Sequence, residues 1–140
     1  MDRMTTHDNK QRIDAFVQDV FNRGDVAAAD QYIDRSFVDH APWPGQPGSR
    51  DGFKAGLADF RAAFPDLRVE QQRMIAEDAT VVGHFTISGT HLGVFMGAPP
   101  SGKSFRIDAV DIVTVRDGRI VEHWGVMDGA ALAQQLGLAP

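Results

Sequence analysis

Histidines and aspartates are the side chains in this sequence best suited to proton transfer. The chain has five histidines and no cysteine, which excludes thiol nucleophiles, thiolate metal sites and disulfides. His40 ends a short apolar run before a loop rich in proline and glycine, and His123 lies within another apolar run. Asp111 interrupts a third run, where a carboxylate faces either water or a cavity. These three residues are the candidates for acid–base chemistry.

The hairpin between the last two predicted strands decides whether Asp111 meets His123. If residues 116–118 form a three-residue loop, Asp111 lies directly opposite His123. If the loop has two residues, Asp111 lies opposite Trp124 instead. Both faces of the hairpin are largely apolar, so the hydrophobic pattern leaves the two registers open.

A pairing of Asp111 with His123 allows several interpretations. A carboxylate beside an imidazole favours the imidazolium and raises the histidine pKa. A carboxyl group in an apolar cavity can instead stay protonated and donate a hydrogen bond to an oxyanion. Either arrangement suits proton transfer beside a carbonyl group. The simplest alternative is a polar pair that only fixes the strand register.

Periodicity and turn residues predict which elements carry these side chains. An apolar stripe with spacings of three and four, typical of an amphipathic helix, comprises Ile13, Phe16, Val17, Val20 and Phe21. Further helices are expected over 25–32, from Ser49 or Asp51 to Pro65, and over 129–136. Strands are expected over 37–40, 67–76, 80–91, 104–115 and 119–127, with tight turns making the last four antiparallel. The order predicts an α+β fold, with three helices against one curved antiparallel sheet.

Composition limits the classes of partner and compartment. The 140 residues carry a formal charge of −5 and are 43% hydrophobic, which predicts one folded domain over 1–140 with residues 1–8 disordered. No block of Lys and Arg occurs, so neither nucleic acid nor a membrane surface is an expected partner. No apolar stretch approaches ~18 residues, and the first ten lack the apolar segment of a signal peptide. A cytoplasmic location is therefore expected.

Short motifs follow one another in order along nearly the whole chain. They are DHAP at 39–42, AFPDL at 63–67, GTHLG at 89–93, PPSGK at 99–103, DGRIVEHW at 117–124 and QQLG at 134–137. In this order, residues 10–138 resemble the SnoaL-like polyketide cyclase family, whose fold is that of nuclear transport factor 2 and ketosteroid isomerase. The resemblance implies a cone-shaped curved sheet wrapped on three N-terminal helices, and a homodimer.

The resemblance also assigns roles to residues. His40 matches the general base of ketosteroid isomerase, Asp111 its oxyanion-hole acid, and His123 the acid/base of the polyketide cyclases. Val17 stands where the isomerase has its catalytic tyrosine, and it cannot donate a hydrogen bond, so steroid isomerisation is not expected. The expected substrate-binding residues are Val17, Trp43, Phe60, Val82, His84, Ile107 and Met127.

The sequence thus predicts a cofactor-independent enzyme that acts on a small apolar carbonyl compound by acid–base catalysis. The expected reaction is an aldol cyclisation or an isomerisation. His40 would be the base or acid, His123 its counterpart, and Asp111 an orienting group or oxyanion donor. No metal or other cofactor is expected. The alternative is a non-catalytic module of the same fold that binds a small molecule or mediates dimerisation.

Overall fold

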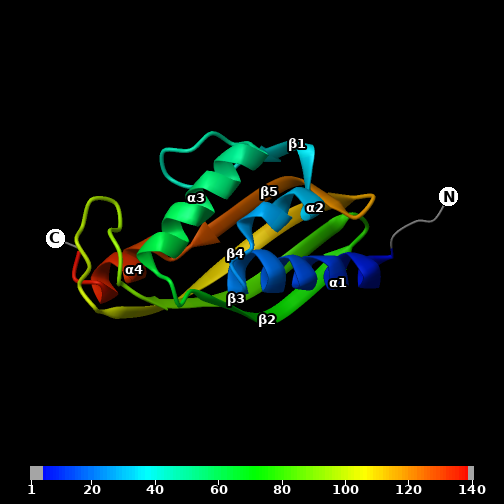
Figure 1. The fold of residues 1–140 in the computed structure, drawn as a ribbon. Coiled ribbons are helices and arrows are strands. Elements are labelled where there is room, and N and C mark those ends of the chain that lie inside the picture. Colours follow the sequence, from blue (N-terminus) through cyan, green and yellow to red (C-terminus); the bar gives the residue numbers. More distant parts are fainter. Residues whose placement is uncertain (1–4, 139–140) are drawn as a thin grey trace.

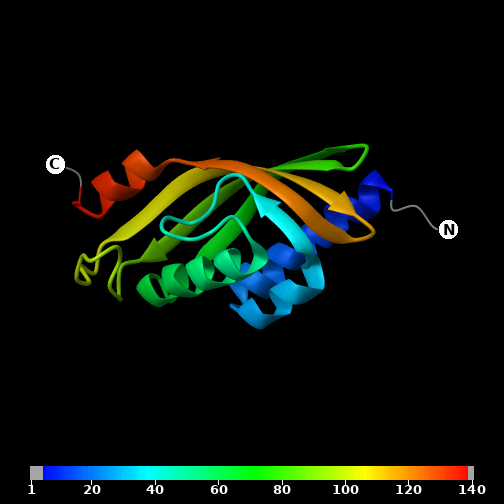
Figure 2. The ribbon, with the colours of Figure 1, turned by 90° about the horizontal axis from the view of Figure 1, so that it is seen from above.

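A curved five-stranded sheet, helices on one of its faces and a short helix at its end form the protein, of which the computed structural model describes residues 5–138 (Figure 1). The strands are β1 (Ile33–Asp39), β2 (Arg68–Glu77), β3 (Thr80–Thr90), β4 (Ser104–Arg116) and β5 (Arg119–Met127). The helices are α1 (Thr6–Phe16), the π-helical η1 (Val17–Asn22), the 3-10 turn η2 (Val26–Ala28), α2 (Ala29–Tyr32), α3 (Arg50–Ala63) and α4 (Gly129–Gln135). Figure 2 shows α1, α2 and α3 on one side of the sheet. The predicted α+β fold is confirmed.

The strand order β1-β5-β4-β3-β2 departs from the prediction in one respect. β1 pairs with β5 in parallel, whereas every other neighbouring pair is antiparallel as expected. A tight turn fixes the relative direction of two strands only when they follow one another directly in the chain. β1 and β5 are separated by most of the chain, so that argument does not apply to them.

The β4–β5 hairpin matches neither predicted register. Asp117 and Gly118 form a two-residue turn with φ of 52° and 76°, the positive values of a type I′ turn. A bulge then shifts the ladder by one residue between Thr114 and Val115. Asp111 therefore lies opposite Gly125, but the shift returns Asp111 and His123 to the same face of the sheet. The three-residue register therefore predicted the wrong residue opposite Asp111, but it placed Asp111 and His123 on the correct, shared face of the sheet.

The N-terminal helix starts earlier than the sequence suggested. The Thr5 hydroxyl accepts a hydrogen bond from the Asp8 backbone N–H, and the Asp8 carboxylate accepts one from the Thr5 N–H, both at 3.0 Å. This reciprocal cap satisfies two backbone donors at the helix start. Thr6–Asp8 are consequently helical rather than disordered, and residues 1–4 lie outside the described residues.

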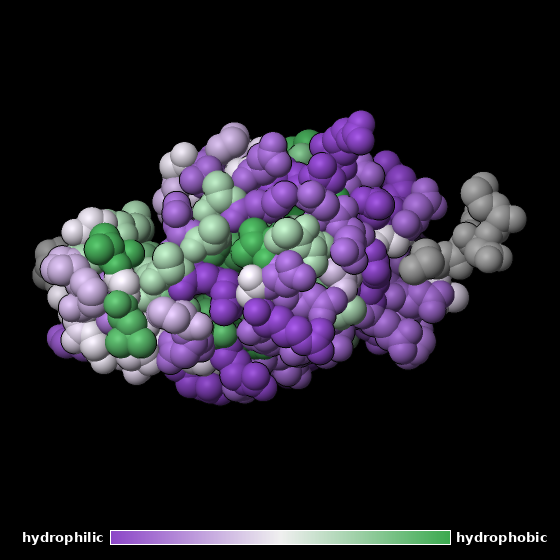
Figure 3. Space-filling view, viewed as in Figure 1, coloured by the Kyte–Doolittle hydropathy of each residue, from purple (hydrophilic) through white to green (hydrophobic). Residues whose placement is uncertain are grey.

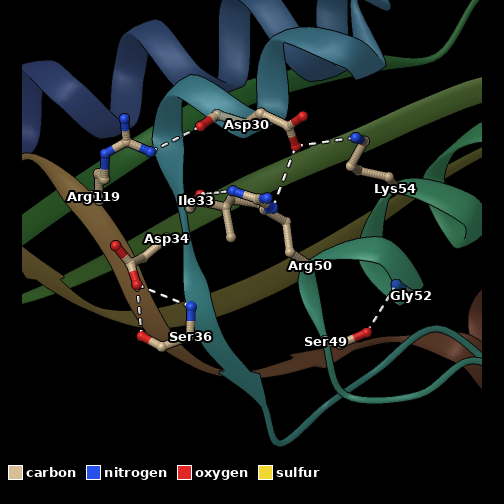
Figure 4. A network of polar contacts seen from close by, with 9 residues as sticks. All are labelled: Asp30, Ile33, Asp34, Ser36, Ser49, Arg50, Gly52, Lys54 and Arg119. Carbon is tan, nitrogen blue, oxygen red and sulfur yellow. Dashed lines mark hydrogen bonds and ion pairs between the residues drawn. The ribbon is translucent and has the colours of Figure 1, made fainter.

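A polar network fixes the start of β1 between α3 and β5 (Figure 4). The Asp30 carboxylate lies 3.0 Å from Lys54 Nζ and 3.3 Å from Arg50 Nε, both on α3. Arg50 also donates to the Ile33 carbonyl at 3.2 Å, and Arg119 of β5 donates to the Asp30 carbonyl at 2.9 Å. These bonds hold the strand that ends at Asp39.

The hydrophobic core fills the space between the helices and the sheet. At the end near α4, a cluster of aromatic rings is centred on Phe60 and Phe64. The centroid of the Phe60 ring lies 4.9–6.2 Å from the centroids of the neighbouring rings.

The surface beyond this cluster is less polar. Figure 3 shows hydrophobic residues over the 91–103 loop and α4, and Leu92, Val94 and Met96 are exposed there. None of the helices within residues 5–138 is long and apolar enough to cross a membrane.

Candidate active site

A cavity of about 240 Å³ lies between the concave face of the sheet, α1, η1 and the 41–48 loop. Its wall is mainly apolar, and the aromatic side chains in it are Phe16, Phe21, Phe37, Trp43, Phe53 and Phe85. Among the described residues, the titratable groups lining the cavity are Asp39, Asp111 and His123. An apolar pocket with a few convergent polar groups is the usual form of a small-molecule site.

The His123 imidazole lies between two carboxylates. Its Nδ1 is 2.7 Å from Asp39 Oδ1 and its Nε2 is 2.8 Å from Asp111 Oδ1. Because carboxylate oxygens accept, both ring nitrogens donate, which is the arrangement of an imidazolium. Burial on its own would lower the pKa of His123, but the hydrogen bonds and charges of Asp111 and Asp39 outweigh it and raise the pKa from 6.5 to about 9. His123 is therefore protonated at neutral pH.

The two carboxylates differ in exposure. The Asp39 side chain is 3% exposed, and its Oδ1 also accepts the Ala41 backbone N–H at 2.9 Å. The Asp111 side chain is 37% exposed, and only its Oδ1 accepts a hydrogen bond within residues 5–138. Asp39 is thus a fixed anchor for His123. Asp111 lines the cavity and is the more exposed of the two carboxylates.

Strand alternation explains why Asp39, rather than His40, belongs to this cluster. Phe37 is a buried core residue on β1, and residues two apart on a strand face the same side. Asp39 pairs with His123 in the parallel β1–β5 ladder and points inward with Phe37. His40, the residue predicted as the base, lies outside this cluster, and its neighbour Asp39 belongs to it. The buried Phe37 was the signal in the sequence that identifies Asp39.

His40 lies on the outer face of the sheet. Its ring stacks on Trp124 at 4.8 Å between centroids and 14° between planes, and its Nε2 lies 2.7 Å from Glu122 Oε2. The side chain is 41% exposed and does not line the cavity. His40 therefore does not meet Asp111 and His123 in one site.

The seven predicted substrate-binding residues divide by their position. Val17, Trp43 and Met127 line the cavity. Val82 and His84 do not line the cavity, contrary to the prediction. Phe85 faces inward, and because side chains alternate along a strand, Val82 and His84 point to the outer face. There His84 Nε2 lies 3.3 Å from Asp108 Oδ1.

Phe60 and Ile107 are the other two corrections. Both are buried in the core, at 5% and 4% exposure, and neither lines the cavity. Phe60 lies behind Trp43, with the two ring centroids 5.1 Å apart, and thereby supports the cavity wall from outside. Apolar residues of a helix stripe or a strand do not reveal from sequence alone whether they meet a ligand or other core residues.

Comparison with known proteins identifies the family of the chain. The model of the SnoaL-like polyketide cyclase family matches residues 11–136. The chain belongs to the SnoaL-like polyketide cyclase family. It is similar to nogalonic acid methyl ester cyclase of Streptomyces nogalater, with 28% identity over 84% of this chain and 89% of that protein.

Two solved structures of family relatives have the same fold. TsrD from Streptomyces laurentii superposes with a TM-score of 0.87 at 25% identity, over 98% of this chain and 100% of that one. IdmH from Streptomyces antibioticus gives a TM-score of 0.81 at 33% identity, over 94% and 99% of the two chains. The fold and family expected from the sequence motifs are thus confirmed.

Proposed function

We propose that this member of the family is a cofactor-independent cyclase that closes a ring in a neutral, largely apolar carbonyl compound by an intramolecular aldol reaction. One observation carries the proposal: a carboxylate with a free oxygen, Asp111, hydrogen-bonded to a buried imidazolium inside an otherwise apolar cavity. The related nogalonic acid methyl ester cyclase provides the reaction class. Proton transfer by a positioned side chain contributes about 10²–10⁴-fold to rate.

Asp111 is the proposed acid–base group. Its free oxygen takes a proton from a carbon flanked by carbonyl groups, which leaves an enolate. The enolate carbon attacks another carbonyl carbon of the same molecule, so that one C–C bond forms and one C=O π bond breaks. Asp111 returns the proton to the resulting alkoxide. The product is an isomer of the substrate, so the step needs no oxidant, reductant or co-reactant.

His123 and Asp39 act through Asp111 in this proposal. Both His123 N–H groups are already hydrogen-bonded to carboxylates, so the imidazolium orients Asp111 and supplies a fixed positive charge beside it. Asp39, buried and held by the Ala41 N–H, fixes the ring in turn. His123 and Asp39 are therefore positioning residues, a different division of roles from the one expected with His40.

The charge of the site limits the substrate. Within residues 5–138 no Lys or Arg lines the cavity, and two carboxylates with one imidazolium give the cluster a formal charge of −1. A substrate carboxylate would therefore meet a net negative cluster with no Lys or Arg to balance it, which favours an ester or another neutral carbonyl compound. The aromatic wall suits a planar ring system.

The test uses nogalonic acid methyl ester, the compound for which the related cyclase is named. The wild-type protein and Asp111→Asn are each mixed with it, and ring closure is followed by absorbance and mass spectrometry at unchanged mass. The proposal predicts conversion by the wild type and at least a ~100-fold slower rate for the variant. Binding seen as quenching of tryptophan fluorescence in the wild type but not in Trp43→Phe, with no conversion of this ester or of simpler aromatic β-keto esters, would instead establish the non-catalytic binding module.

The outer face of the sheet supports a second proposal, that the protein is a homodimer. Val38, Trp124, Val126 and Ile112 are 47%, 39%, 73% and 37% exposed on neighbouring strands. Exposed apolar side chains that gather on one face often mark a protein–protein contact. Light scattering should give twice the chain mass for the wild type and a monomer for Trp124→Glu; a wild-type monomer would contradict the proposal.

We also propose the cytoplasm as the compartment of this protein. A chain without cysteine gains no disulfide from an oxidising compartment. Fractionation of cells that express the full chain tests this, and recovery in the periplasm or culture medium would contradict it.

A further inference from the structure

Gly125 lies directly opposite Asp111 in the β4–β5 ladder, on the face that lines the cavity. A Cβ atom at this position would lie 2.6 Å from Asp111 Oδ1 and 2.8 Å from His123 Nε2. Non-bonded carbon contacts are normally about 3.5 Å or longer, so both atoms are too close for any side chain at residue 125. The space above Gly125 is the space in which the Asp111–His123 hydrogen bond forms.

The diagonal placement of the two partners explains this requirement. Because of the bulge in the hairpin, His123 lies opposite Val113 and reaches Asp111 across the position of residue 125. Diagonal neighbours on a sheet are about 7–8 Å apart at their Cα atoms, so the His123 ring must lean toward Asp111 for the two to touch. A side chain on the residue between them would occupy the path that Asp111 and His123 use.

Asp111 is the partner that would have to move. His123 is fixed on its other side by Asp39 at 2.7 Å, and Asp39 is 3% exposed and held by the Ala41 N–H. Within residues 5–138 Asp111 has only the single bond to His123, and its side chain is 37% exposed. An obstruction at residue 125 should therefore rotate Asp111 toward the cavity and leave the Asp39–His123 bond in place.

We propose that Gly125 is a positioning residue of this site: its lack of a side chain lets Asp111 bond to His123 through one oxygen while the other oxygen faces the cavity. The effect on turnover rests on the proposed function. The effect on His123 does not, since it concerns only contacts within the protein.

The test compares Gly125→Ala with Gly129→Ala, a matched control at a glycine where an added Cβ atom would have nothing within 4 Å. The ring nitrogens of ¹⁵N-labelled histidine report the titration of His123 by NMR. Gly125→Ala should lower the pKa of His123 by at least about one unit, because one of its two carboxylate partners is lost. It should also lower kcat at least ~10-fold with KM changed less than about threefold. Gly129→Ala should match the wild type in both measurements.

A titration of His123 in Gly125→Ala that matches the wild type would overturn the proposal, whatever the activity. If Gly125→Ala lowers the pKa of His123 and the wild type turns over no ester, the role of Gly125 is upheld. That result would count against the proposed function alone.

A second pair of variants covers the case in which Gly125→Ala fails to fold. In the Asp111→Ala background the nearest obstructed atom is gone, and His123 Nε2 has lost the carboxylate that holds it close to residue 125. The double variant should therefore fold, and its His123 pKa should be close to that of Asp111→Ala. Loss of folding, or a further large shift, in the double variant but not in Asp111→Ala would show that Gly125 acts elsewhere and would overturn the proposal.

Discussion

Replacing His123 by glutamine should destabilise the protein in a pH-dependent way. The substitution keeps a side chain of similar size but removes the positive charge between Asp39 and Asp111. In the wild type the pKa of His123 is raised from 6.5 to about 9, chiefly because the hydrogen bonds to these carboxylates outweigh burial. Each pKa unit corresponds to about 1.4 kcal/mol, so the shift is equivalent to about 3 kcal/mol of folding free energy. Only 19% of the side chain is exposed, so solvent screening reduces this value little.

The sign follows from proton linkage. The folded protein holds the proton of His123 more tightly than the unfolded chain, so this stabilisation is complete below pH 6.5 and is lost as the pH rises through 9. His123→Gln should therefore be about 3 kcal/mol less stable than the wild type at pH 6. The difference should shrink toward zero by pH 10, because the wild-type imidazole is then neutral as well.

Urea unfolding of both proteins, followed by tryptophan fluorescence at pH 6, 7, 8, 9 and 10, measures this difference. Titrating groups that do not contact His123 are common to the two proteins, so their contributions cancel in the comparison. A difference in unfolding free energy that stays constant across this range, or equal stability at pH 6, would refute the assignment of His123 as a buried imidazolium between two carboxylates.

Three further predictions follow from the same structure. His40→Gln should change the rate of ring closure less than about twofold, because His40 lies on the outer face; a large loss of kcat in steady-state assays would contradict its exclusion from the site. Trp43→Ala should raise KM about tenfold with a smaller change in kcat, because it removes part of the aromatic wall; an unchanged KM would show that Trp43 does not contact the substrate. Ser101→Ala should lower the unfolding free energy by about 1 kcal/mol, because the fully buried His91 loses its 2.9 Å partner; unchanged urea unfolding would contradict that role.

The sequence predicted the elements of the fold because local signals mark them clearly. The helical spacing of apolar residues in 13–21, the proline at 65 and the Asp117-Gly118 turn each act over a few residues. The parallel pairing of β1 with β5 depends on contacts between distant segments, and the bulge after the hairpin turn is a one-residue shift in how two strands pair. Neither leaves a pattern in the order of residues.

The site was predicted in part. Asp111 and His123 share one face and are hydrogen-bonded, as one of the two sequence interpretations required, although their register differs. The choice between Asp39 and His40 depended on which face of a short strand is inward, and only the buried Phe37 indicates it. The role of Gly125 needs three-dimensional coordinates, because it concerns the space between two side chains.

The central claim is that the free oxygen of Asp111 removes a proton from carbon beside a carbonyl group in the cavity. Deuterium exchange tests it most directly: an aromatic β-keto ester is incubated with the protein in D₂O, and loss of the proton signal of the carbon between its carbonyls is followed by NMR. We predict exchange above the buffer rate with the wild type and exchange at the buffer rate with Asp111→Asn. Exchange at the buffer rate with the wild type, or undiminished exchange with Asp111→Asn, would contradict the claim.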